Sequence, residues 1–293
     1  MDLPASVVNL GEQLRADDEI VPEPALFSDP QVFAAERERI FQRSVVALDH
    51  ETRLSEDRRW FRCEAAARSL LVTREAGGRL HALRNLCLHA GYPVCEAEEG
   101  TGERLMCPYH GWEYSLEGRL VEPELSSRID PARLRLASYP VRIFNGLIVV
   151  DPAGAGAADT AAAGSLPDWL ATAGVTARQQ FKTNRNWKFV RHLIQSSPQL
   201  FFDGSPDDCQ AIGPLGLLFT RAESAVLVRI LPKFAEQTDI HAIEMASGGT
   251  GGGAKFAVCE NNIAEHLGCA ETGLSWFDRD FAQWYWTLVS AGD

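Results

Sequence analysis

Two short pairs of cysteine and histidine constrain this chain more than any other feature. Cys87 and His89 form a C-x-H pair, Cys107 and His110 form a C-x2-H pair, and 17 residues separate His89 from Cys107. Two thiolates and two imidazoles in this order suit a [2Fe-2S] cluster with both thiolates on one iron and both imidazoles on the other. We therefore expect each pair on its own tight loop, with a sheet that brings the two loops face to face.

A zinc site is the alternative, because two thiolates and two imidazoles also suit tetrahedral zinc. Zinc fingers usually pair Cys with Cys and His with His, so the mixed pairs found here are unusual for them. The order of the ligands favours the iron–sulfur interpretation.

The segment 85–114 resembles the cluster-binding loops of Rieske proteins. Gly111-Trp112, directly after the second pair, resembles the ring-hydroxylating oxygenase branch of that family. Respiratory-chain Rieske proteins add a disulfide between the loops, whereas the matching positions here hold Tyr92 and Tyr109. The resemblance thus implies an oxygenase-type centre of lower potential. The cluster ligands that it implies are Cys87, His89, Cys107 and His110.

Composition limits the partners of the chain. The 293 residues carry a net charge of −12, which argues against nucleic acid or an anionic membrane as a partner. No run of about 18 apolar residues occurs, and the first residues lack the pattern of a leader peptide. We expect a cytoplasmic protein. The cysteines outside the two pairs are expected to be buried free thiols: Cys63, Cys95, Cys209, Cys259 and Cys269.

The order of patterns predicts an α+β protein with two domains. Residues 1–42 are expected to form an arm and a helix that begins at Asp29-Pro30, with residues 1–25 unpatterned. Residues 43–152 contain short β segments, including a hairpin around Asn145-Gly146, and predict a small all-β [2Fe-2S] domain. Residues 153–165 are rich in Ala and Gly and predict a linker.

The remaining part, 166–293, alternates helical and strand patterns. The resemblance implies that it is a helix-grip domain, in which an antiparallel sheet holds a long helix, as in the catalytic part of Rieske oxygenases. The expected helices are Asn186–Phe202, Glu260–Leu267 and Asp278–Leu288. The expected strands are Leu217–Thr220, Ala225–Leu231 and Thr238–Met245.

In the family, this domain holds a mononuclear Fe(II) ion through two His and one carboxylate. The motif Asn186-Trp187-Lys188 resembles the start of the helix that precedes these ligands. Gln199 and Gly204 then occupy the expected His positions, and Glu260 occupies the expected Asp position. Ser196 falls where the family has an acidic residue between the two metal sites. The resemblance therefore predicts that the mononuclear iron site is lost.

Other residues offer one way to rebuild that site. His192 lies on the same predicted helix about two turns before Gln199, and His241 lies in an alternating strand. A set of His192, His241 and Glu260 is chemically conceivable as an iron site. A single His on an apolar face is more commonly a hydrogen-bonded core residue.

The resemblance implies a Rieske [2Fe-2S] oxygenase-family subunit and an oxidoreductase. It would take electrons from a ferredoxin or flavin reductase and pass them to a mononuclear iron centre on a partner subunit. That centre would hydroxylate a small organic substrate with dioxygen. The implied assembly is a homo- or hetero-oligomer with a catalytic α-like subunit. The alternatives are a self-sufficient oxygenase with non-standard iron ligands, and an electron-transfer or small-molecule-binding protein without oxygenase activity.

Overall fold

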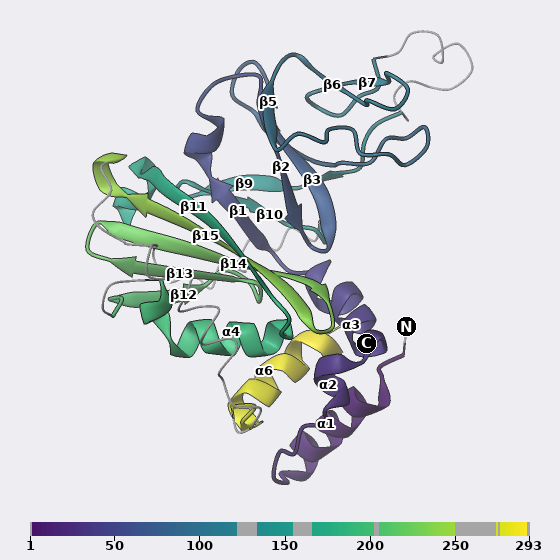
Figure 1. The fold of residues 1–293 in the computed structure, drawn as a ribbon, viewed down its shortest axis with the longest axis vertical. Coiled ribbons are helices and arrows are strands. Elements are labelled where there is room, and N and C mark those ends of the chain that lie inside the picture. Colours follow the sequence, from purple (N-terminus) through teal and green to yellow (C-terminus); the bar gives the residue numbers. More distant parts are fainter. Residues whose placement is uncertain are drawn as a thin grey trace.

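The computed structural model describes residues 2–121, 134–154, 166–201, 205–249, 274 and 276–291. Helices at the two ends of the chain lie together beneath the sheet that contains β11 to β15, and the sheets that contain β1 to β10 lie on its other side (Figure 1). In this part of the chain no helix is long and apolar enough to cross a membrane. The mixture of helices and antiparallel sheets confirms the predicted α+β class.

Helices open the chain, where the sequence predicted an unpatterned arm over residues 1–25. They are α1 (Ala5–Ala16), α2 (Ala25–Ser28) and α3 (Pro30–Glu36), which continues into the π-helical turn η1 (Arg37–Phe41). The arm prediction was wrong because α1 is stabilised by a distant partner. Gly11 of α1 lies so close to the Trp286 ring that a Cβ at this position would overlap the indole. The predicted start of α3 is confirmed, since the Asp29 carboxylate accepts from Gln31 N at 2.7 Å.

Two sheets form the first β region. One has the strand order β5-β2-β3-β4-β8, the other has the order β1-β10-β9, and β6 pairs with β7 as a separate ribbon. The predicted hairpin at Asn145-Gly146 is confirmed, because both residues have left-handed φ values, 42° and 79°, as a type I′ turn requires. The strands of this region are β1 (Val46–His50), β2 (Arg59–Ala65), β3 (Arg68–Arg74), β4 (Leu80–Arg84), β5 (Glu99–Thr101), β6 (Arg104–Met106), β7 (Glu113–Ser115), β8 (Ser138–Tyr139), β9 (Val141–Phe144) and β10 (Leu147–Val150).

The larger sheet has the order β11-β15-β14-β13-β12 and is antiparallel throughout. Its strands include the three that the sequence predicted, each with slightly wider bounds, and two that it did not. They are β11 (Gly174–Thr183), β12 (Asp208–Ala211), β13 (Gly216–Arg221), β14 (Ser224–Phe234) and β15 (Gln237–Ala246).

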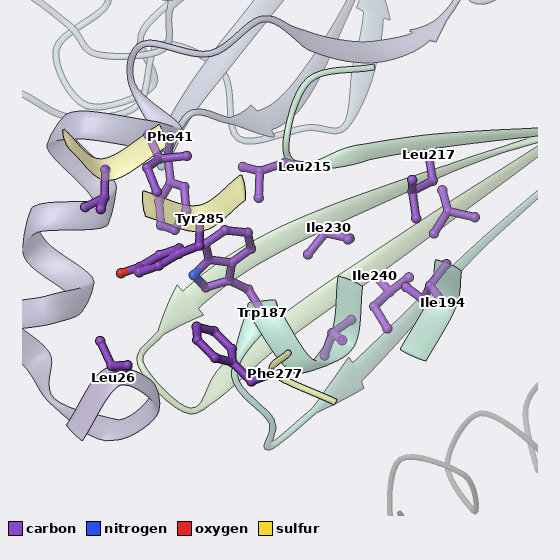
Figure 2. Close-up of a cluster of buried hydrophobic side chains, with 14 of the residues drawn as sticks. Leu26, Phe41, Trp187, Ile194, Leu215, Leu217, Ile230, Ile240, Phe277 and Tyr285 are labelled. Atoms are coloured by element: carbon purple, nitrogen blue, oxygen red, sulfur yellow. The ribbon is translucent and has the colours of Figure 1, made fainter. Parts of the chain in front are cut away.

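Alternation along these strands gives the sheet two apolar faces. One face packs against the helices, with Ile230 and Ile240 against Trp187 and Tyr285 (Figure 2). The opposite face packs against β1 and β10 through alternate residues such as Ile243. The sheet therefore lies between the helices and the small β1-β10-β9 sheet.

The helix after the Asn-Trp-Lys motif is shorter than predicted. Helix α4 spans Trp187–Ser196, and a separate 3-10 turn covers Pro198–Leu200. The Asn186 side chain caps α4 by accepting from Lys188 N at 2.9 Å. Pro198 has no N–H for a continued helix, so the helix ends before it. The predicted helix Glu260–Leu267 lies outside the described residues, and α6 (Arg279–Ser290) follows the capping residue Asp278 as predicted.

Polar side chains join the large sheet to the first β region. Arg229 of β14 is buried and donates to the backbone oxygens of Ala47 at 3.0 Å and Glu64 at 2.6 Å. Arg178 of β11 forms a two-pronged ion pair with Asp49 of β1, at 2.8 and 3.2 Å. These contacts fix the orientation of β1 on the sheet.

Candidate functional site

The two Cys/His pairs lie on loops with the same backbone pattern. In the first loop, Cys87 N donates to Tyr92 O at 2.7 Å and Gly91 N donates to Cys87 O at 2.9 Å. In the second loop, Cys107 N donates to the oxygen of the residue five positions later, Trp112, at 2.9 Å, and Gly111 N donates to Cys107 O at 2.9 Å. Each glycine has a positive φ, 69° and 72°, which a side chain would strain.

Burial divides the four predicted ligands into an inner and an outer pair. Cys87 and Cys107 are 4% and 1% exposed, whereas His89 and His110 are exposed. The two imidazole rings lie together, with their centroids 4.4 Å apart. His89 also stacks on Trp112, at 4.9 Å and an interplanar angle of 12°. The structure thus brings all four residues together, with the thiols inside and the imidazoles at the surface.

Hydrogen-bond donors converge on the sulfurs. The Tyr114 hydroxyl accepts from Leu88 N at 3.0 Å and lies 3.2 Å from Cys87 Sγ, so its own proton is available to the sulfur. Burial raises the pKa of Cys107, while hydrogen bonds from the backbone N–H groups of Tyr109 and His110 act to lower it. Donors of this kind stabilise negative charge on ligating sulfurs.

Sequence reasoning missed the residue that closes the first loop. Asn85 is buried, and its side chain accepts from Cys95 N at 2.9 Å and donates to Cys95 O at 2.9 Å. Asn85 thereby joins the two ends of the segment that contains Cys87 and His89. Nothing local in the sequence marks Asn85 or Tyr114 for these roles, because their partners are set by the fold.

The other described cysteines are free and differ in burial. Burial, and then the neighbouring Cys107, raises the pKa of Cys95 to about 12. Burial also raises the pKa of Cys63, to about 11. Both thiols are therefore protonated near neutral pH, which is the inert state expected from the sequence. Cys209 is exposed, contrary to that expectation, and Cys259 and Cys269 lie outside the described residues.

The donor set fits a two-iron cluster better than a single zinc ion. Tetrahedral zinc requires four donors around one point. The separation into a buried thiol pair and an exposed imidazole pair instead matches a cluster with a different ligand type on each iron.

None of the described residues at the positions expected for the mononuclear iron site is a His or a carboxylate. Gln199 is exposed on the turn Pro198–Leu200, and Ser196 is exposed at the end of α4, where its hydroxyl donates to His192 O at 2.9 Å. Gly204 and Glu260 lie outside the described residues.

The large sheet separates the two histidines considered for a rebuilt site. His192 lies on α4 and packs against the rings of Trp276 and Phe281, at 5.3 and 6.3 Å. Ala242 packs with α4, so its neighbour His241 points to the opposite face, where it lies beside Arg229. The structure therefore does not bring His192 and His241 together.

Exposed apolar side chains occur on the two cluster loops and directly beside them in the sequence. The rings of Tyr109 and His110 lie 3.9 Å apart, and Tyr92 lies 5.3 Å from Tyr109. Tyr109 and Met106 are each 59% exposed. We call this set the cluster rim; it consists of Leu86, Leu88, Tyr92, Met106 and Tyr109.

Comparison with known sequences supports the interpretation of the two loops as part of a [2Fe-2S] domain. Residues 44–140 match the family model of the Rieske [2Fe-2S] domain. The N,N-dimethyl phenylurea N-demethylase subunit alpha of Sphingobium sp. (strain YBL2) is 33% identical over 129 residues, which are 42% of this chain and 28% of the relative. Choline monooxygenase of Amaranthus tricolor is 26% identical over 201 residues, 62% of this chain and 44% of the relative. The matches thus span less than half the length of these relatives.

Solved structures match over more of the chain. The quaternary ammonium Rieske monooxygenase CntA in complex with γ-butyrobetaine superimposes with a TM-score of 0.70 at 16% identity, covering 92% of this chain and 94% of that one. Naphthalene 1,2-dioxygenase from Rhodococcus sp. gives a TM-score of 0.64 at 18% identity, covering 98% and 85%. At these identities the likeness establishes the fold, including the part that follows the cluster loops.

Proposed function

This chain carries a Rieske [2Fe-2S] domain and resembles the α subunits of Rieske oxygenases, and from this premise we propose that it is an electron-transferring oxygenase subunit. It accepts electrons from a ferredoxin or flavin reductase and delivers them to a mononuclear iron centre on a partner subunit. The overall reaction is hydroxylation of a small organic substrate with dioxygen. The relatives named above, a demethylase subunit and a choline monooxygenase, support this substrate size.

The division of the cluster site into buried thiols and exposed imidazoles is the observation that carries the proposal. Cys87 and Cys107 would hold the inner iron, and His89 and His110 the outer one. When bound there, the cluster supplies reversible one-electron storage, with a potential raised by its neutral imidazole ligands. Because the imidazoles are exposed, a partner can approach this side of the site directly.

The cluster rim supports contact with a partner protein. Interface centres are enriched in Tyr and Met, and exposed apolar side chains exclude water when a partner covers them. The rim supplies Tyr109, whose ring packs on His110, and Tyr92 beside Tyr109, while Met106 is exposed directly before Cys107 in the sequence. A protein partner on this surface would shorten the distance for electron transfer and keep water away from the imidazole edge.

The surroundings of α4 support placing the mononuclear iron on another subunit. A facial iron site needs two imidazoles and a carboxylate. Gln199 offers only an amide, and it is exposed. His192 faces an aromatic cluster on one side of the sheet, while His241 lies on the other.

The content of iron and acid-labile sulfide per chain tests this function. We expect about two irons and two sulfides, as one [2Fe-2S] cluster requires. About three irons would favour the self-sufficient oxygenase with non-standard ligands. Zinc without sulfide would overturn the redox assignment altogether.

A second measurement tests the destination of the electrons. The chain is reduced by a ferredoxin and its reductase, then mixed with an α-like subunit that has complete iron ligands but lacks its own cluster. Product formation that depends on this chain, and that is lost in the His110→Ala variant, is the expected result. Formation of the same product without the second subunit would contradict the proposed division of roles.

A further inference from the structure

A second concave site lies between α4 and the start of α6. Both helices lie beneath the large sheet (Figure 1), and the cavity between them has a volume of about 360 Å³. This volume is within the range of pockets for small molecules. We call this cavity the helix pocket, and the lining side chains that matter below are Arg191, His192, Asp278, Asp280, Phe281 and Trp284.

Arg191 gives the helix pocket a buried positive charge. The residue is 4% exposed, and its guanidinium donates to Pro214 O at 2.8 Å. No carboxylate of the described residues forms an ion pair with it. Burial lowers the pKa of Arg191 to about 10, which still leaves the side chain charged at neutral pH. A buried charge without a counter-ion is unfavourable, and an anionic group bound beside it would offset that cost.

The guanidinium of Arg191 is held in a position from which it can bind a carboxylate. Its central carbon lies 4.7 Å from the centroid of the Trp284 ring, a cation–π contact that restrains the side chain. A guanidinium has five N–H donors, more than the Pro214 carbonyl can use. A planar group of this kind can donate two parallel hydrogen bonds to one carboxylate. Because it is already restrained, it loses less conformational entropy when a ligand binds.

Negative charge lies at the outer side of the helix pocket. Asp278 and Asp280 both line it and both are exposed, whereas Arg191 is buried. Asp278 caps α6 by accepting from Phe281 N at 2.9 Å, so one of its oxygens is already used. The two signs of charge therefore occur at different depths, with the cation inside and the carboxylates towards solvent.

Aromatic rings form the wall between the two charged ends. Phe281 and Trp284 are half-buried, and their ring centroids lie 5.0 Å apart. His192 is also half-buried and lies 6.3 Å from Phe281. Burial lowers the pKa of His192, although Asp278 opposes this effect, so the imidazole is neutral near pH 7. It thus adds ring surface to the middle of the pocket and no second cation.

We propose that the helix pocket binds a small ω-amino acid, with its carboxylate on Arg191 and its protonated amine beside Asp280. The methylene chain of such a ligand would lie against the aromatic wall. A simple carboxylate would leave the Asp280 end unmatched, and a simple amine would meet the guanidinium. None of the four predicted cluster ligands lines this pocket, so the site does not depend on the function proposed above.

Calorimetric titration of the full chain with small probes tests the proposal. The probes are 4-aminobutanoate, 5-aminopentanoate and 6-aminohexanoate, which differ in the distance between their charges, together with pentanoate and pentylamine, which carry one charge each. We expect saturable 1:1 binding of at least one amino acid. Pentanoate and pentylamine should each bind at least tenfold more weakly than that amino acid. Absence of saturable binding for all three amino acids would overturn the proposal.

Two variants test the two charged ends separately. Arg191→Gln keeps a donor for Pro214 O but loses the charge, and it should weaken binding of the amino acid at least tenfold. Asp280→Asn changes an exposed residue and should remove the preference for the amino acid over pentanoate. Glu236→Gln is the matched control, because it neutralises an exposed carboxylate in the β14–β15 turn, outside the pocket, and should leave all affinities unchanged.

The unfolding midpoint of each variant shows whether it is folded. Unchanged affinity in a folded Arg191→Gln variant would overturn the proposal. If that variant does not fold, Asp280→Asn decides the matter alone: a preference for the amino acid that persists in Asp280→Asn, or that falls equally in Glu236→Gln, would overturn it.

Discussion

Lys188 and Glu36 lie 152 positions apart in the sequence and form a fully buried ion pair between α4 and α3, with side-chain exposures of 0% and 1%. The other carboxylate oxygen of Glu36 accepts from Trp187 Nε1 at 2.8 Å, and Tyr285 donates its hydroxyl to the paired oxygen at 2.8 Å. Trp187 and Lys188 of the Asn-Trp-Lys motif thus both bind the Glu36 carboxylate, and Asn186 caps α4. The motif has a structural role here that requires no iron.

Loss of the ammonium group should destabilise the protein strongly. Burial lowers the pKa of Lys188, and the charge of Glu36 opposes that effect. Lys188→Met leaves the Glu36 carboxylate buried without its cation, which typically costs about 3–5 kcal/mol. Denaturant unfolding should show this loss, whereas Lys182→Met on the exposed side of β11 should change stability by less than about 0.5 kcal/mol. Similar midpoints for the two variants would contradict a structural role for the ion pair.

Two glycines with similar positive φ angles should respond differently to replacement by alanine. Gly146 has φ 79°, and an added Cβ would lie 2.8 Å from Leu170 O and also overlap the His50 ring. Gly154 has φ 65°, and no atom of the described residues lies within 4 Å of a Cβ added there. Gly154→Ala should cost about 1–2 kcal/mol from the left-handed conformation alone. Gly146→Ala should cost clearly more, as measured by the free energy of unfolding; equal costs would show that the turn can shift.

His241 should make stability depend on pH in the mildly acidic range. Burial, together with the charges of Arg229, Lys233 and Arg53, lowers its pKa from 6.5 to about 3 in the folded protein. Below pH 6.5 the unfolded chain takes up a proton that the folded chain does not, so stability is complete above that pH and falls as the pH drops towards 3. Between pH 7 and pH 5 this loss amounts to about 1–2 kcal/mol.

The pH profile of a variant isolates this contribution. In His241→Gln the loss should disappear, and the difference between the two unfolding profiles should follow a single group. The contributions of the other titratable groups to the unfolding free energy are the same in both proteins, so they cancel in that difference. Parallel profiles for the two proteins would mean that His241 has the same pKa in the folded and unfolded states.

Removing the Tyr114 hydroxyl should lower the reduction potential of the cluster. The hydroxyl lies 3.2 Å from Cys87 Sγ, and its hydrogen bond is stronger when the sulfur carries more negative charge, that is, in the reduced state. A difference of about 1 kcal/mol corresponds to roughly 40 mV for one electron. A redox titration of Tyr114→Phe should show this decrease. Tyr92→Phe is the control, because that hydroxyl donates to Glu96 at 2.7 Å, and an equal shift in both variants would exclude a specific effect.

Replacement of the residue at an expected iron-ligand position should have no effect on metal content. Gln199 is exposed, so Gln199→Ala should keep the same iron and sulfide per chain and the same stability. Cys107→Ala in parallel should lose the cluster. A fall of about one iron per chain in Gln199→Ala, with sulfide unchanged, would reveal a mononuclear site.

Features that depend on neighbours in the chain were predictable. Capping residues mark the starts of α3, α4 and α6, because each side chain accepts from a backbone N–H two or three residues ahead. The Asn145-Gly146 turn needs only its own left-handed backbone. The backbone shape of each cluster loop also follows from local spacing, because the hydrogen bonds that close the loop involve the backbone N–H and C=O of its own cysteine.

Features that depend on distant partners were not predictable. Helix α1 owes its stability to α6 at the other end of the chain, so residues 1–25 appeared unpatterned. His192 and His241 both have patterns consistent with one cavity, yet the alternation of β15 places His241 on the face away from α4. The partners of Asn85 and Glu36 likewise exist only after the chain has folded.

By itself, the sequence determined the chemistry of the cluster site: two thiols, two imidazoles and the glycine turns that carry them. Ligand type and loop closure are local properties, and they are encoded within about thirty residues. The tertiary structure decided what surrounds that chemistry. It buried the Cys87 and Cys107 thiols and exposed the His89 and His110 rings. It also placed a sheet between the two histidines considered for a rebuilt iron site. Burial and sheet faces arise only when distant segments pack together.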